Sequence, residues 1–127
     1  MSTILLIEDN AQNRYLINYL LTHRGHVVIN AENGEDGVAL ALSERPDLIL
    51  LDIQLPGMDG YDVARLLRTH AVLGAIPVIA VTSHAMVGDR ETALRAGCTE
   101  YIEKPIDPDV FAGTVEAFLT PPARPAP

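Results

Sequence analysis

Short apolar runs alternate with amphipathic segments along this chain, and the alternation constrains its fold more than any other feature. The runs occupy residues 3–7, 26–30, 48–51, 77–81 and, less clearly, 99–103. Three of them are nearly all apolar and rich in Ile, Leu and Val, which is typical of strands covered on both faces of a sheet. Strands that alternate strictly with helices form a parallel sheet with right-handed crossovers. The sequence therefore predicts a doubly wound α/β fold with five parallel strands, in the order 2-1-3-4-5, and five helices.

The segments between and after these runs carry helical patterns. The first begins near Asn10 and stops at Gly25, and we expect Leu16, Tyr19 and Leu20 on its buried face. Apolar residues at such spacings give a helix one face that packs against a sheet. The residues expected to be buried in the second, third and fifth helices are Val38, Ala41 and Leu42, then Val63, Leu66 and Leu67, and finally Phe111, Val115, Phe118 and Leu119.

The length of 127 residues fits one domain, which we place at residues 1–120, followed by a proline-rich tail at residues 121–127. The single cysteine, Cys98, has no second thiol for an internal disulfide, and we interpret it as a small packing residue.

No apolar run reaches the length of a membrane span, and the N-terminus lacks the basic start of a secretory signal. We therefore expect a cytoplasmic protein without a membrane partner. The formal net charge of -8 argues against a nucleic-acid partner, which would require a basic surface.

Reactive side chains follow four of the five predicted strands. Glu8 and Asp9 come after the first, Asp52 after the third, Thr82 after the fourth and Lys104 after the fifth. Each has an ordinary explanation taken alone, such as a helix cap, a turn or a solvated surface charge. In an open parallel sheet, however, ligands bind beyond the carboxyl ends of the strands. Since one geometric rule gathers all of these side chains at one edge, we expect a functional site there.

The charges at this edge predict its chemistry. Carboxylates a few ångström apart oppose each other's ionisation unless a cation compensates. Lys104, the only lysine of the chain, supplies one positive charge. Mg²⁺ fits the remaining deficit, because it binds carboxylate oxygens and keeps positions open for phosphate oxygens. An aspartate can accept a phosphoryl group as an aspartyl-phosphate, whose negative charge Mg²⁺ and the Lys104 ammonium would meet from two sides.

Four motifs then indicate a family. They are LLIEDN at 5–10, LLDIQLPGMDGYD at 50–62, AVTS at 80–83 and YIEKP at 101–105. In this order and at these spacings the set closely resembles the receiver domain of two-component response regulators, in its stand-alone form, over roughly residues 3–120. The resemblance implies a flavodoxin-like fold and a signalling protein that is not an enzyme with an external product.

The resemblance also implies roles for the acidic residues and the lysine. Asp52 would be the phospho-acceptor. Asp9, with Glu8 partly through water, would hold Mg²⁺ together with Asp52 and the backbone carbonyl of Gln54. Lys104 would pair with the phosphoryl group. The family resemblance leaves open whether the bond from Lys104 to the following proline is cis.

A switch is implied as well. Thr82 would hydrogen-bond a phosphoryl oxygen after transfer and pull its loop inward, and Tyr101 would turn from solvent toward the vacated space. The output surface would consist of the fourth helix, at about 86–96, with the fifth strand and the fifth helix, and would expose Met86, Val87 and Tyr101. His84, two residues after Thr82, would tune hydrolysis of the phosphoryl group, as would Gln54.

The partners implied are a histidine kinase or a histidine phosphotransfer protein as donor and a downstream protein on the output surface. We expect a monomer. Two alternatives stay open at this point. An aspartate-nucleophile phosphohydrolase usually carries a second aspartate two residues after the first, where this chain has Gln54. A receiver-like binding module that works without phosphate would need none of the site residues, although all are present.

Overall fold

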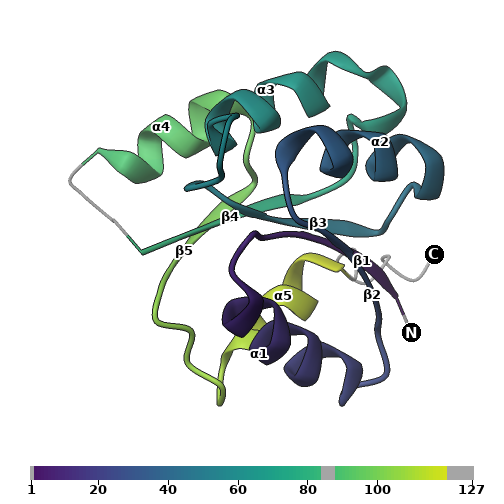
Figure 1. The fold of residues 1–127 in the computed structure, drawn as a ribbon, viewed down its shortest axis with the longest axis vertical. Helices are drawn as coiled ribbons and strands as arrows, with labels where there is room; N and C mark the ends of the chain where they lie inside the picture. The colour runs from purple at the N-terminus through teal and green to yellow at the C-terminus, as the bar shows by residue number, and fades with distance from the viewer. Residues whose placement is uncertain (1, 84–87, 120–127) are drawn as a thin grey trace, which may run out of the picture.

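The structure is a computed structural model, and it describes residues 2–83 and 88–119. Within that part, five parallel strands form one sheet (Figure 1). The strands are β1 (Thr3–Ile7), β2 (Val27–Ala31), β3 (Leu48–Asp52), β4 (Val78–Thr82) and β5 (Glu100–Glu103). Their order is β2-β1-β3-β4-β5, as the sequence predicted.

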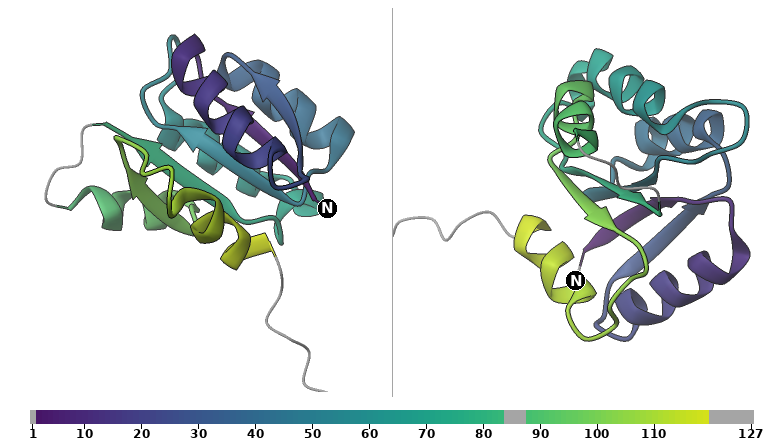
Figure 2. Two further views of the ribbon diagram at one scale, coloured as in Figure 1. Left: turned by 90° about the horizontal axis from the view of Figure 1, so that it is seen from below. Right: turned by 90° about the vertical axis from the view of Figure 1, so that its left-hand side faces the viewer.

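Helices cover both faces of this sheet. They are α1 (Ala11–Thr22), α2 (Gly34–Glu44), α3 (Gly60–Thr69), α4 (Asp89–Ala96) and α5 (Phe111–Leu119), with a short 3₁₀ helix, η1 (Ala71–Leu73), before β4. α2, α3 and α4 lie on one face, and α1 and α5 lie on the other, as the views in Figure 1 and Figure 2 agree. The predicted doubly wound fold is confirmed.

Alternating side chains of the central strands build two separate core layers. In β1, Leu5 and Ile7 pack under α2 and α3, whereas Ile4 and Leu6 pack under α1 and α5. β3 and β4 alternate in the same way. Both layers are apolar, which explains why these strands show continuous apolar runs in the sequence. Burial of each large side chain stabilises the fold by about 1.5–3 kcal/mol. The packing of the central strands therefore fixes the positions of the residues at their carboxyl ends.

Side-chain caps start three helices directly after the strand-end loops. Asn10, Asn33 and Asp59 each accept a hydrogen bond from a backbone N–H of the first turn of α1, α2 and α3 respectively. Gly97 ends α4 in the left-handed region at φ 112°, where residues with a side chain are disfavoured. The loops that follow β1, β2 and β3 are therefore fixed at their helical ends.

Two predictions about helix faces are wrong. Tyr19 is 55% exposed and stacks on His23 with ring centroids 5.6 Å apart, and Leu66 is 37% exposed. In α1 the buried residues are Ile17 and Leu21, so the face that meets the sheet is rotated by about one residue from the predicted one. The reason is that α1 has apolar residues on more than half of its circumference, and contact with the sheet, which periodicity does not show, selects among them.

The remaining fold expectations concern Cys98 and the chain termini. Cys98 is buried in the layer between the sheet and α4, as expected for a packing residue, and this burial raises its thiol pKa to about 11. The predicted tail at residues 121–127 lies outside the described residues. No helix in the described part of the chain is both long and apolar enough to cross a membrane.

Candidate functional site

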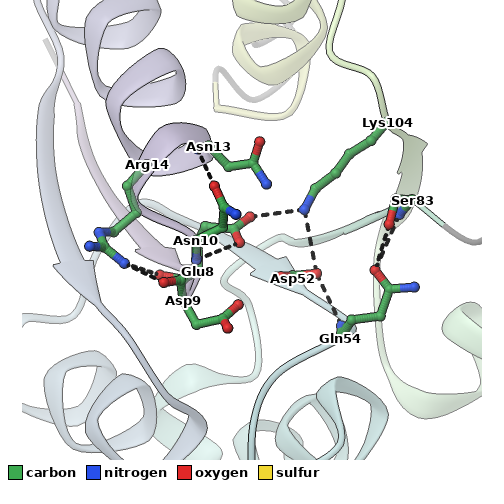
Figure 3. A network of polar contacts seen from close by, with 9 residues as sticks. All are labelled: Glu8, Asp9, Asn10, Asn13, Arg14, Asp52, Gln54, Ser83 and Lys104. Atoms are coloured by element: carbon green, nitrogen blue, oxygen red, sulfur yellow. Dashed lines mark hydrogen bonds and ion pairs between the residues drawn. The ribbon is translucent and has the colours of Figure 1, made fainter.

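Side chains from three strand ends meet at the carboxyl edge of the sheet (Figure 3). Glu8 and Asp9 follow β1, Asp52 is the last residue of β3, and Lys104 follows β5. Parallel pairing of β1 with β3, of β3 with β4 and of β4 with β5 keeps these strand ends level. Figure 3 shows the Lys104 ammonium directed between the carboxylates of Glu8 and Asp52.

Two of the three carboxylates in this group are buried. Glu8 is 1% exposed and Asp52 is 3% exposed, whereas Asp9 is exposed. One oxygen from each of the three lies within 4.8 Å of the others. Burial raises the pKa of Glu8 above its ordinary value, and the neighbouring Asp52 carboxylate raises it further. The carboxylates of this group therefore repel one another, and this repulsion favours binding of a cation.

Lys104 supplies part of the compensation. Its Nζ lies 3.1 Å from Oε1 of Glu8 and 3.7 Å from Oδ1 of Asp52, and only 11% of the side chain is exposed. The backbone N–H of Lys104 donates to the carbonyl of Thr82 at 2.7 Å, which extends the pairing of β5 with β4 by one residue. The bond between Lys104 and Pro105 is cis. The residue that carries the ammonium is thus held at the end of β5 by a hydrogen bond to the end of β4.

Backbone amides hold the two buried carboxylates in place. The N–H of Asn10 donates to Oε2 of Glu8 at 3.1 Å, and the N–H of Gln54 donates to Oδ1 of Asp52 at 3.0 Å. Hydrogen bonds from N–H groups stabilise the ionised form of a carboxylate and fix its orientation. They therefore work against the mutual repulsion of Glu8 and Asp52.

Arg14 on α1 is a part of this site that the sequence reasoning missed. Its Nη1 donates to the carbonyl of Glu8 at 3.0 Å and to that of Asp9 at 2.9 Å, and its Nη2 lies 3.8 Å from Glu32. The guanidinium holds the backbone of Glu8 and Asp9, which we call the acidic loop, and adds a second positive charge beside it. In the sequence Arg14 is one of eight arginines, and no motif sets it apart.

Comparison with known proteins decides the family. The family model described as the response regulator receiver domain matches residues 4–116. This chain belongs to the response regulator receiver family. Protein PilH of Pseudomonas aeruginosa is 40% identical over 119 residues, which cover 94% of this receiver and 98% of PilH. The polar-differentiation response regulator DivK of Brucella anthropi is 42% identical over 117 residues, which cover 92% of this receiver and 95% of DivK.

A solved structure agrees with this assignment. The receiver domain of a sensor histidine kinase from Pseudomonas aeruginosa PAO1 matches with a TM-score of 0.85 and 35% identity, over 93% of this chain and 97% of that chain. It was solved with a magnesium ion coordinated in the active site cleft. The resemblance drawn from the four sequence motifs is confirmed, and the chain is a receiver domain of two-component signalling.

The acidic group of this receiver fits a divalent cation. Mg²⁺ binds oxygen ligands at about 2.1 Å in an octahedron, so opposite ligands lie about 4.2 Å apart, close to the 4.8 Å that encloses the three carboxylate oxygens. Oε1 of Glu8 faces Lys104 and Oε2 accepts from Asn10. Both Glu8 oxygens are thus engaged; direct ligation by Asp9 and Asp52, with Glu8 acting through water, stays a prediction. The backbone carbonyl of Gln54 lies in the loop after Asp52, and its part in metal binding stays a prediction.

The predicted switch residues lie on the last two strands of the sheet, Thr82 at the end of β4 and Tyr101 within β5. Thr82 is buried at the end of β4. Tyr101 on β5 is half-buried and packs on the α4 side of the sheet; its hydroxyl is buried and has no hydrogen-bond partner among the described residues. Burial raises its pKa. The expected solvent-facing Tyr101 is therefore not what this structure shows, because the mostly apolar ring gains more by packing than by exposure. The other residues named for this region, His84, Met86 and Val87, lie outside the described residues.

Proposed function

We propose that this receiver accepts a phosphoryl group on Asp52 from a phosphohistidine, in an Mg²⁺-dependent reaction, and that it then signals to a protein partner. The observation that carries the proposal is the buried Asp52 carboxylate, 3.7 Å from the Lys104 ammonium and grouped with two further acids. A buried charge usually has a matched partner, whereas here the buried carboxylates of Glu8 and Asp52 share one ammonium and the exposed Asp9 lies beside them. An excess of negative charge destabilises the fold, but it suits a site that binds a cation and a phosphoryl group together.

The transfer step is a displacement at phosphorus. A carboxylate oxygen of Asp52 forms the new bond to phosphorus, and the bond from phosphorus to the donor imidazole breaks, with its electron pair staying on nitrogen. Lys104 is placed to contact an oxygen of the arriving group and to stabilise its charge. Glu8, Asp9, Asp52 and the carbonyl of Gln54 would hold Mg²⁺, which supplies positive charge to phosphoryl oxygens when bound. Since the product stays on the chain, we regard the protein as a self-modifying signalling domain.

The signal would pass through the strands next to the acceptor. Asp52 is paired with Val81 across β3 and β4, and Thr82 is the next residue along β4. The Thr82 hydroxyl is therefore suited to bind an oxygen of a phosphoryl group on Asp52. Tyr101 lies on β5, which is paired with β4. A groove of about 270 Å³ runs along β5 and the start of α5, lined in part by Tyr101 and Val110. We propose that a downstream protein binds the α4–β5–α5 surface and senses a change there.

The donor in this proposal is a histidine kinase or a histidine phosphotransfer protein. The stand-alone form is supported by PilH and DivK, of which the match covers nearly the whole length. A monomer, a cytoplasmic location and the lack of a nucleic-acid partner stay predictions from composition and charge.

The test is phosphorylation followed by intact mass. Wild-type protein is incubated with acetyl phosphate and Mg²⁺, beside Asp52→Asn and the matched control Asp62→Asn, whose acid is exposed on α3 and paired with Arg65. We expect the mass of one phosphoryl group on wild type and on Asp62→Asn, none on Asp52→Asn, and none when Mg²⁺ is chelated. No mass gain with acetyl phosphate or with a phosphorylated histidine donor would favour the phosphate-independent binding module instead.

A further inference from the structure

The groove between β5 and the start of α5 is lined mainly by apolar side chains. It has a volume of about 270 Å³, and Tyr101, Val110 and Phe111 are among the residues that line it. Val110 is 55% exposed although it is apolar, and β5 is an edge strand of the sheet. An apolar groove with an exposed aliphatic side chain beside it is a typical contact point for a single anchoring side chain of a partner.

The charged residues of this groove are acidic. Glu103 and Asp107 line it, and the exposed Asp109 follows two residues later. None of these three carboxylates forms an ion pair with another described residue, and no described residue that lines the groove is cationic. Burial raises the pKa of Tyr101, and the charges of Asp89 and Glu103 raise it further. The electrostatic potential at the groove is therefore negative, which favours a cationic partner.

Residues 103–105 connect the groove with the phosphoryl acceptor. Glu103 and Pro105 line the groove, whereas Lys104 between them directs its ammonium to Asp52 at 3.7 Å. The backbone N–H of Lys104 holds the same segment to the carbonyl of Thr82. A movement of Lys104 toward a phosphoryl group would therefore also move residues that line the groove.

We propose that this groove binds a cationic amphipathic segment of the downstream protein. One apolar side chain of that segment enters the groove beside Tyr101 and Val110, and its lysine or arginine side chains pair with Glu103 and Asp107. This inference rests on the proposed function, because it names the chemistry of the partner on the α4–β5–α5 surface. A second copy of this chain fits less well, since it carries the same acidic groove and a net charge of -8.

The experiment uses three helical model peptides as probes. The first has leucine on one face and lysine on the other, the second has glutamate in place of each lysine, and the third has glutamine in place of each leucine. Calorimetry on the unmodified full chain measures each affinity, and shifts of backbone amide signals in NMR locate the bound peptide. We expect the leucine–lysine peptide to bind about tenfold or more tightly than the other two, with its shifts centred on Tyr101 and Val110.

One pair of variants tests the charges of the groove. Glu103→Gln combined with Asp107→Asn removes both carboxylates, and the asparagine keeps a side-chain oxygen that can accept the backbone N–H that Asp107 binds. Glu35→Gln combined with Glu44→Gln removes two exposed acids of α2 and is the matched control. We expect the groove variant to weaken binding of the leucine–lysine peptide by about threefold or more, and the control to leave the affinity unchanged.

A second pair of variants tests the apolar contact. Val110→Gln removes the exposed aliphatic group beside the groove. Val72→Gln is the matched control, because Val72 is 54% exposed on η1, before β4, and does not line the groove. We expect Val110→Gln to weaken binding by about threefold or more, and Val72→Gln to leave the affinity unchanged.

A further titration tests the connection with the acceptor. The leucine–lysine peptide is added to protein held in acetyl phosphate and Mg²⁺, with the phosphoryl group verified by intact mass and Asp52→Asn as the control. Because the groove shares residues 103–105 with Lys104, we expect the affinity of the phosphorylated protein to differ by about fivefold or more from that of the unmodified protein. The affinity of Asp52→Asn should be the same with and without acetyl phosphate.

The outcomes separate this inference from the proposed function. Wild type that gains no phosphoryl mass overturns the proposed function, whereas the titrations of unmodified protein still decide the chemistry of the groove. A glutamate or glutamine peptide that binds as tightly as the leucine–lysine peptide, or unchanged binding in the groove variants, overturns the inference. So does a dimer in sedimentation that Val110→Gln dissociates, because a second copy then occupies the groove. Phosphorylated protein with unchanged affinity overturns the part of the groove in the signal.

Discussion

Replacing Lys104 with methionine tests the charge balance of the acidic group. The substitution keeps an unbranched side chain and removes the ammonium that lies 3.1 Å from Glu8 and 3.7 Å from Asp52. At an effective dielectric constant of about 20, each of these contacts has a Coulomb energy of roughly 5 kcal/mol. The ammonium also loses hydration on burial, and removing one partner of a buried pair costs about 3–5 kcal/mol in practice. We expect Lys104→Met to lower the free energy of unfolding by about 3 kcal/mol at pH 7.5 in the presence of a chelator.

The loss should depend on pH in a stated direction. The pKa of Glu8 is already raised by burial and by Asp52, and the loss of Lys104 would raise it further. Between the unfolded and the folded pKa of such a group, the folded state binds more protons, so stability falls as pH rises. The deficit of Lys104→Met relative to wild type should therefore be smaller at pH 5 than at pH 8.

Urea unfolding followed by far-ultraviolet circular dichroism measures both effects, because the chain has no tryptophan. Arg65→Met is the control, since the ion pair of Arg65 with Asp62 is exposed and worth less than about 1 kcal/mol. Added Mg²⁺ should recover part of the deficit of Lys104→Met by restoring positive charge. A variant as stable as wild type in chelator, or a deficit that is the same at pH 5 and pH 8, would refute the reasoning.

The remaining predictions concern the acceptor loop, the acidic loop and α5. Gly60→Ala would place a Cβ 2.7 Å from the carbonyl oxygen of Asp52; we expect a loss of about 1–3 kcal/mol in urea unfolding and slower phosphorylation, and normal behaviour would disprove the close packing. Arg14→Ala frees the backbone of the acidic loop, so Mg²⁺ affinity in calorimetry should fall by roughly threefold or more; unchanged affinity would remove Arg14 from the site. Arg24 holds the pKa of Glu116 at about 2, so this carboxylate stabilises the fold above its unfolded pKa and loses that effect as pH falls toward 2. Glu116→Gln should therefore cost about 1 kcal/mol at pH 7 and less at pH 3, and an equal cost at both would contradict the assignment.

Much of the architecture could be predicted because it depends on local patterns. The continuous apolar runs predicted central strands with two covered faces, and Leu5 and Ile4 indeed pack into opposite layers. The gathering of Asp52 and Lys104 followed from strand direction alone, since parallel strands end at the same edge. Helix faces were less predictable: in α1 several apolar residues compete, and only contact with the sheet shows that Ile17 is buried.

The finer parts of the site could not be predicted because they depend on backbone groups and on side-chain direction. Arg14 binds carbonyl oxygens, which every residue type supplies, so no residue pattern marks the contact. The hydrogen bond between the side chains of Gln54 and Ser83 joins loops that are 29 residues apart, and neither residue carries a charge. The inward position of the Tyr101 hydroxyl likewise depends on packing between β5 and the helices above it.

The measurement that tests the central claim most directly is the location of the phosphoryl group on the chain. Borohydride reduces an aspartyl-phosphate to homoserine, so treatment of the phosphorylated protein followed by peptide mass mapping marks the residue that carried the group. We predict homoserine in place of Asp52 and at no other aspartate. Homoserine in place of Asp9, or phosphorylated protein in which every aspartate survives the treatment, would contradict the account.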